Sequence, residues 1–257
     1  MKKRWSATAC AIAGIAAMTI AGCGRGRIAF DTIQEEKLVR LNECEYELDY
    51  SFSWPVARRG DRALERITAQ MASEFFGVRR FDGSVERAAA EYERALAEEW
   101  DDPAADSVLW SGYFTSSSVC GTVLGGRVMN NTVYKSSYTG GAHGMYNTFY
   151  YNYRLSDGSR IALAEAVDGQ ALETLLPELI RRTLRAAYGA ADDEGLLQAG
   201  FFDPAEIGPT ENFLLTDRSI VFCYGPYEVA CYATGEVFAE IPYEELQGHL
   251  LPLVTGR

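Results

Sequence analysis

The chain has 257 residues, with 24 basic and 36 acidic side chains and a formal net charge of −12 at pH 7. This excess of acid argues against binding to nucleic acid or electrostatic adhesion to anionic lipid, because phosphates need basic partners. It favours attraction of a cationic partner, although a charge that serves only solubility is the alternative.

The N-terminus has the layout of an export signal. A basic start, MKKRW, precedes an apolar run that is too short for a comfortable membrane span. Ile20, Ala21, Gly22 and Cys23 resemble the end of a bacterial lipoprotein signal, in which the cysteine is lipidated and becomes the new N-terminus. An ordinary cleaved signal is the alternative. Removing residues 1–22 takes away three basic residues and no acidic one, so the net charge becomes −15.

Cysteines outside the signal are even in number. Cys44, Cys120, Cys223 and Cys231 remain once Cys23 is assigned to the lipid, which predicts two disulfides in an oxidising compartment. Three pairings are possible, and we favour Cys44–Cys120 on neighbouring antiparallel strands and Cys223–Cys231 across a turn. The absence of a Cys-x-x-Cys spacing argues against a redox motif or a zinc site.

The first half of the mature chain predicts a strand followed by two helices. Residues 23–40 show no clear periodicity and predict a tether, whereas alternation over residues 44–55 predicts a strand. Apolar residues spaced by three or four over residues 61–77 predict an amphipathic helix. Residues 84–100 predict a second helix, with Ser84 as its N-cap.

The rest of the chain predicts a meander and then a second α+β unit. Serine, threonine, valine and tyrosine over residues 107–153 predict an antiparallel meander of about four strands. The later elements are a helix over 168–189 kinked at Pro177, a short helical piece over 192–202, a hairpin over 212–229, and a strand entering a short helix over 236–246. We therefore predict an α+β fold with domains at 41–155 and 156–257.

Few residues suggest catalysis or metal binding. His143 and His249 are the histidines of the sequence, and they belong to no metal motif. No Gly-x-Ser-x-Gly elbow or phosphate-binding loop occurs, although a pair of carboxylates or a Cys–His pair stays open. We expect no catalytic residue, metal or cofactor.

The stretch YTGGAHG, residues 138–144, is the most distinctive motif. Gly140, Gly141 and Gly144 allow positive φ and close approach of two backbones. His143 can donate from one ring nitrogen and accept at the other, so we expect it to hold two loops together between buried groups. Direct ligand contact and catalysis are the alternatives.

Together with the later stretch ENFLLTDRSIVFCYGPYEVACYATGEVFAEIPYEEL, this motif resembles the RsiV-like family of exported domains. The resemblance covers roughly residues 40–250 and implies two paired domains. The best-known relative is the lysozyme-binding extracellular part of an anti-sigma factor, and others are fused to polysaccharide deacetylases or are free lipoproteins. The sequence shows no cytoplasmic segment with a membrane span and no deacetylase His/Asp motif, so we expect neither activity. Cys231 stands where the family commonly has proline, and Cys223 replaces an aromatic residue.

We expect a non-enzymatic, exported protein, anchored by lipid to the periplasmic or cell-surface face of a bacterial membrane. Its expected partner is a cationic protein such as a lysozyme-like muramidase, or peptidoglycan, and not nucleic acid. An envelope hydrolase acting on peptidoglycan and a structural lipoprotein are the alternatives. The residues expected to bind the partner or hold the loops are Tyr138, Thr139, Gly140, Gly141, His143, Gly144, Asn147, Tyr227, Glu228 and Tyr232.

Overall fold

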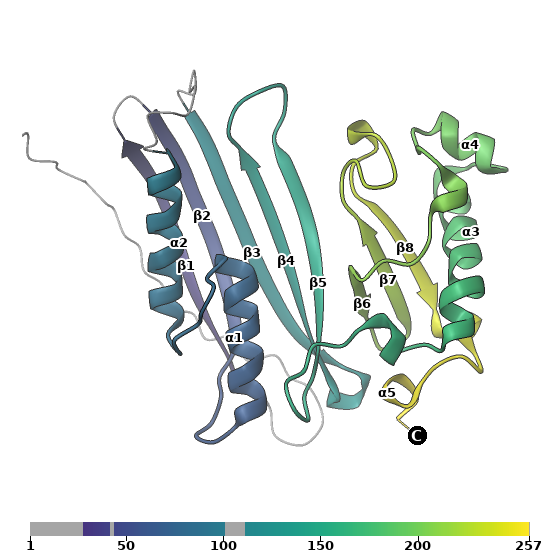
Figure 1. Cartoon of the computed structure of the whole chain (residues 1–257), viewed down its shortest axis with the longest axis horizontal. Coiled ribbons are helices and arrows are strands. Elements are labelled where there is room, and N and C mark those ends of the chain that lie inside the picture. Colours follow the sequence, from purple (N-terminus) through teal and green to yellow (C-terminus); the bar gives the residue numbers. More distant parts are fainter. Residues whose placement is uncertain (1–27, 42–43, 101–110, 257) are drawn as a thin grey trace, which may run out of the picture.

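Two β-sheets with covering helices form the fold, and the predicted α+β class is confirmed (Figure 1). The computed structural model describes residues 28–41, 44–100 and 111–256, so the predicted signal and Cys23 lie outside the described residues. The five-stranded sheet, in spatial order, consists of β1 Phe30–Leu41, β2 Cys44–Pro55, β3 Ser111–Val123, β4 Val128–Tyr138 and β5 Met145–Arg154. The three-stranded sheet consists of β6 Phe213–Leu215, β7 Ser219–Tyr224 and β8 Val237–Pro242. The helices are α1 Arg62–Phe76, α2 Val85–Trp100, α3 Leu176–Tyr188, α4 Asp193–Gln198 and α5 Pro252–Thr255.

Helices α1 and α2 lie in the connection between β2 and β3 and cover one face of the larger sheet (Figure 1). β2 and β3 pair in parallel, while the other neighbouring strands pair antiparallel. Parallel neighbours need a crossover of a dozen or more residues, and these helices provide it. Both helices follow the predicted ranges closely.

Helix α1 is capped at both ends, and α2 has a cap at its N-terminus. The Asp61 side chain accepts a hydrogen bond from the Leu64 N–H at 3.1 Å, and Gly77 ends α1 in the left-handed region with φ 69°. Ser84 Oγ accepts from the Arg87 N–H at 3.2 Å, which makes Ser84 the predicted N-cap of α2. The apolar stripe of α1 is buried against the sheet.

The segment predicted as a tether contains a strand, so the tether over residues 23–40 is wrong from Phe30 onward. β1 pairs with β2 along its whole length, and its exposure alternates. The alternation escaped detection because the inward positions include Glu35 and Lys37. Lys37 is satisfied there by an ion pair with Glu93 of α2. Charged inward residues of this kind also make an edge strand a poor template for aggregation.

A further prediction needs correction, and another agrees with the structure. Within the described residues the meander has three strands, β3 to β5, where the sequence predicted about four. A continuous helix does run through Pro177, from residue 169 to Tyr188, and it is irregular there as predicted. The π-helical segment Ala171–Leu175 lies directly before α3, whose second residue is Pro177, and such a bulge accommodates a proline that has no N–H to donate.

Each sheet has its own hydrophobic core. The first core lies between the larger sheet and helices α1 and α2, and the second lies between the smaller sheet and α3. The larger sheet ends at Arg154, beside the predicted domain boundary at residue 155. Leu124 and Val128 nevertheless belong to the second core, so the two halves share apolar packing.

Asparagine side chains join the two sheets where β5 faces β6. Asn152 of β5 accepts a hydrogen bond from the Leu215 N–H at 3.0 Å and donates to the Phe213 carbonyl at 2.7 Å. In the opposite direction, Asn212 accepts from the Tyr150 N–H at 2.8 Å and donates to the Thr148 carbonyl at 2.9 Å. Each carboxamide thus takes the place of a peptide group from a neighbouring strand.

The bridge continues beyond these two residues. Asn130 donates to the Leu215 carbonyl at 2.5 Å, and the Glu236 carboxylate accepts from both the N–H and the hydroxyl of Thr148. Asn130 and Asn152 are buried. Because unpaired buried backbone groups are costly, these contacts fix the smaller sheet on the edge of β5.

The predicted disulfides are wrong, because Cys120, Cys223 and Cys231 are free thiols. The parallel register matches Glu45 with Ser111, so Cys44 and Cys120 lie toward opposite ends of β2 and β3. Cys223 is buried with its sulfur 3.7 Å from the Thr148 carbonyl. Cys231 instead contacts the Thr234 hydroxyl at 3.4 Å.

No helix of the described residues is long and apolar enough to cross a membrane.

Replacing Asn152 with alanine should lower the free energy of unfolding by about 2–4 kcal/mol. The Phe213 carbonyl and the Leu215 N–H would both lose a partner, at about 1–3 kcal/mol each. Chemical denaturation of the purified variant measures the change. Gln34→Ala is the control, since Gln34 is an exposed amide on β1, and equal midpoints for the two variants would contradict the bridging role.

Thiol labelling of the folded protein near pH 8 should modify Cys231 before Cys120 and Cys223. Burial raises the pKa of the Cys120 and Cys223 thiols to about 12, so almost none of the reactive thiolate forms there. Hydrogen bonds from Thr234 lower the pKa of Cys231. Its reactive thiolate therefore forms at a lower pH than that of an ordinary cysteine. Peptide mapping after labelling, with and without denaturant, gives the order. Early labelling of Cys223 would contradict its burial.

Candidate functional site

One face of the five-stranded sheet is covered by none of the helices in the described part of the chain. Side chains alternate along a strand, so Tyr46 points into the core under α1 and α2 while Glu47 points to the other face. The register aligns Leu38, Glu47, Tyr113 and Tyr138 across β1 to β4 on this uncovered side, which we call the open face. Tyrosines and acids therefore lie side by side on a surface that a partner can reach.

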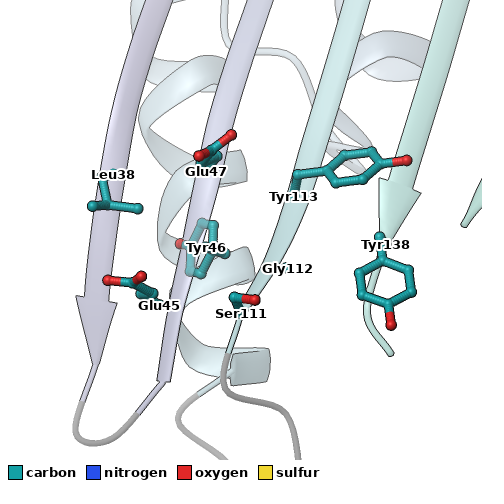
Figure 2. A pocket seen from close by; sticks show the side chains of 8 residues that line it. All are labelled: Leu38, Glu45, Tyr46, Glu47, Ser111, Gly112, Tyr113 and Tyr138. Carbon is teal, nitrogen blue, oxygen red and sulfur yellow. The ribbon is translucent and has the colours of Figure 1, made fainter. Parts of the chain in front are cut away.

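A hollow of about 200 Å³ lies on the open face, toward the end where β1 and β2 join (Figure 2). Its lining consists of Leu38, Glu45, Tyr46, Glu47, Ser111, Gly112, Tyr113 and Tyr138. The rings of Tyr113 and Tyr138 stack with centroids 6.2 Å apart and planes 25° from parallel. The hollow thus combines an aromatic side with two carboxylates.

The acids of the open face are mostly without cations. Glu36 lies directly opposite Asp49 on the neighbouring strand, and both are exposed. Among the described residues, Glu36, Glu47 and Asp49 form no ion pair, whereas Glu45 is 3.1 Å from Arg40 Nε. Like charges directly opposite in a sheet are destabilising, so this arrangement costs stability in the free protein.

The glycine-rich motif forms the tip of the hairpin between β4 and β5. Gly140 and Gly141 have φ values of 107° and 87°, which confirms the predicted positive φ at these two positions, whereas Gly144 does not have a positive φ. The predicted close approach occurs at Gly144 and not at Gly141, where a Cβ would meet nothing within 4 Å. A Cβ at Gly144 would lie 2.8 Å from both the Ser137 carbonyl oxygen and the Tyr113 hydroxyl.

His143 connects this hairpin with the loop after β7. Its Nε2 lies 3.2 Å from the Tyr227 hydroxyl, and its Nδ1 lies 2.9 Å from the Gly144 carbonyl. Its ring stacks on Tyr232 at a centroid distance of 3.7 Å. The contact joins the two halves, as the loop-holding hypothesis requires. The ring is exposed, however, so the expectation that it lies between buried groups is wrong.

Tyrosine hydroxyls gather around the same junction. The Tyr232 hydroxyl donates to the Gly144 carbonyl at 2.7 Å. Partial removal from water raises the pKa of Tyr232, and the nearby hydroxyls of Tyr146 and Tyr113 raise it further. Because Tyr113 also lines the hollow, the hairpin junction and the open face form one continuous aromatic surface.

The other predicted site residues lie in the same region. The Tyr138 hydroxyl donates to the Gly141 carbonyl at 3.1 Å, and Thr139 is exposed on the hairpin. Glu228 accepts from the Gly225 N–H at 2.9 Å, while the Asn147 side chain lies so close to Gly225 that a Cβ there would collide with it. The structure therefore brings the two sequence motifs together.

Sequence reasoning missed Glu36, Glu47, Asp49 and Tyr113. The sequence predicts a tether and an ordinary strand for the acids on β1 and β2, and it does not indicate which strands are neighbours. The alternation in ELDY, residues 47–50, was a usable signal for which acids face outward. The pairing of β2 with β3, which brings Tyr113 beside Glu47, had no local signal.

No group of His, Cys, Asp and Glu among the described residues could hold a metal ion. His249 lies 3.1 Å from Asp168, whose pKa is lowered first by the Ala171 N–H and then by His249, and Asp168 caps the helical segment before α3. That histidine therefore serves the fold of the second half.

Replacing Gly144 with alanine should lower the free energy of unfolding by about 2 kcal/mol, because the new methyl group would overlap the Ser137 backbone. His143→Ala should cost about 1 kcal/mol or less, since the exposed ring loses mainly its stacking on Tyr232. Denaturant melts of both variants check the order. A larger loss for His143→Ala would restore the buried loop-holding hypothesis.

Comparisons with known proteins place this geometry in a known fold. Residues 166–244 match the family model described as "Protein of unknown function (DUF3298)". No curated protein matches the chain. The crystal structure of a DUF3298-family member from Bacteroides fragilis is similar at a TM-score of 0.76 and 24% identity, over 89% of this chain and 96% of that one. A DUF3298-family structure from Pseudomonas aeruginosa has a TM-score of 0.62 and 18% identity, over 89% and 97% of the two chains. The chain thus carries a DUF3298 domain over residues 166–244 and shares the fold of these structures.

Proposed function

We propose that this is a non-enzymatic, lipid-anchored protein of the bacterial cell envelope whose open face binds a basic protein. A lysozyme-like muramidase is the sharpest candidate. The observation that carries the proposal is the open face itself, where tyrosines lie beside acids that have no cation among the described residues.

Charge supports a basic partner. The opposed pair Glu36 and Asp49, with Glu47 on the same face, is relieved when a cation lies over it. The net charge of −12 strengthens the attraction at long range and raises the rate of encounter.

The size of the hollow supports a side chain rather than a small-molecule ligand. Its volume of about 200 Å³ is below the roughly 300–1,000 Å³ typical of small-molecule sites. A lysine or arginine fits the lining, with Leu38 against its methylene groups, Glu47 near its charge and Tyr113 beside it. Tyrosine is also enriched at the centres of protein interfaces.

Two features of the sequence support a lipid-anchored envelope protein with a lysozyme-like partner. The stretch Ile20–Cys23 resembles a lipoprotein signal, which supports export and the lipid anchor. YTGGAHG and the later PYEV segment resemble the RsiV-like family, whose best-known relative binds lysozyme. The structure places these segments against each other at the edge of the open face.

Lysozyme should bind the mature protein, and Glu47→Gln with Asp49→Asn should weaken that binding roughly tenfold, because both acids face the partner. Calorimetry at two salt concentrations measures affinity and its electrostatic part. The matched control is Glu91→Gln with Glu99→Gln, which removes the same charge from exposed positions of α2 on the covered side.

Equal weakening by both pairs would show that only net charge matters and would contradict the open face. If the folded protein does not bind lysozyme, a lysozyme-like muramidase is excluded as its partner. Incubation with peptidoglycan completes the test, since an altered muropeptide profile would support a hydrolase instead.

A further inference from the structure

The end of the molecule where the chain enters β1 carries a group of arginines. Phe30 pairs with Pro55, and the Val56 N–H donates to the Ala29 carbonyl at 2.8 Å, so the β2–α1 loop lies beside the incoming chain. We call residues 56–66, comprising this loop and the start of α1, the arginine end; the loop lies at the foot of α1 in Figure 1.

The arginine end has more positive charge than its acids neutralise. Arg58, Arg59, Arg62 and Arg66 are exposed and form no ion pair among the described residues. The acids of this segment are Asp61, which is engaged as the cap of α1, and Glu65. Val56 is 43% exposed in the same loop. This is an unusual concentration of positive charge in a chain of net charge −12.

The length of chain before β1 limits the distance from any anchor at Cys23. Five peptide steps separate Cys23 from Ile28, which is the first described residue. Fully extended, they span at most about 18 Å. Because β1 begins at Phe30, the chain between an anchor at Cys23 and the fold is much shorter than a tether over residues 23–40 would be. In a protein anchored at Cys23, the arginine end therefore lies close to the membrane surface.

We propose that the arginine end docks on anionic phospholipid headgroups. This inference rests on the lipid anchor of the proposed function. Arginine binds phosphate through a planar fork of donors, and each basic residue near an anionic surface strengthens attachment about fivefold. Tethering supplies a high local concentration, which offsets the repulsion of the remaining acids.

Docking in this way orients the open face. β1 and β2 each have 12 residues, and their other ends, where Leu41 pairs with Cys44, lie about 40 Å from the arginine end. The hollow and the glycine-rich hairpin lie toward that far end, so a partner arriving from the aqueous side meets them first.

Hydrogen exchange of the purified lipoprotein in vesicles tests the docking. Amides of residues 56–62 should exchange on the order of 10-fold more slowly on vesicles of phosphatidylcholine with phosphatidylglycerol than on phosphatidylcholine alone. Arg58→Glu with Arg59→Glu should abolish the difference. The matched control is Arg79→Glu with Arg80→Glu, an equal charge change at exposed arginines beyond the other end of α1, which should keep it.

Equal exchange on the two vesicles, or equal loss in the two variants, overturns the docking. The intact mass of the same sample shows whether acyl chains are attached. Protein without acyl chains overturns the anchor and this inference together, whereas acylated protein with equal exchange overturns the docking alone. Lysozyme affinity, measured separately in solution, reports on the open face independently of both results.

Discussion

The side-chain carboxamides between β5 and β6 are the interaction on which the arrangement of the two sheets depends. An unpaired strand edge invites another chain, and direct pairing of β5 with β6 would merge the sheets into one surface. Asn152 and Asn212 instead satisfy alternate backbone groups across the gap, in opposite directions. The edge of β5 is thereby occupied while each sheet keeps its own core.

This junction also explains how the open face is formed. Helices α1 and α2 cover one side of the larger sheet, and the smaller sheet attaches mainly along the β5 edge and covers the other side at Val128 and Asn130 of β4. The same junction carries the loop after β7 to the glycine-rich hairpin, where Tyr232 and His143 stack. A substitution among the buried asparagines is therefore expected to change the exposed aromatic surface as well, because it would shift the loop after β7.

Sequence reasoning succeeded where local signals decide structure. The cap at Ser84, the stripe of α1 and the positive φ of Gly140 follow from neighbouring residues alone. It failed where distant partners decide. The sequence of β1 shows no clear alternation because Lys37 points inward to Glu93 of α2. The predicted Cys44–Cys120 disulfide is wrong because the parallel pairing of β2 and β3 places the two cysteines toward opposite ends of the strands. For the site, the hairpin motif could be found from composition, whereas the neighbouring acids needed the register.

The acids of β1 and β2 are difficult to explain by stability. Glu36 and Asp49 repel each other across adjacent strands, and their removal from the open face would cost the core nothing. Four exposed arginines, Arg58, Arg59, Arg62 and Arg66, lie instead at the arginine end, where β1 begins. The unpaired acids Glu36, Glu47 and Asp49 thus lie away from these arginines along the length of β1 and β2. Such a separation disfavours neutralisation within the molecule and leaves each end free to attract an external partner of opposite sign.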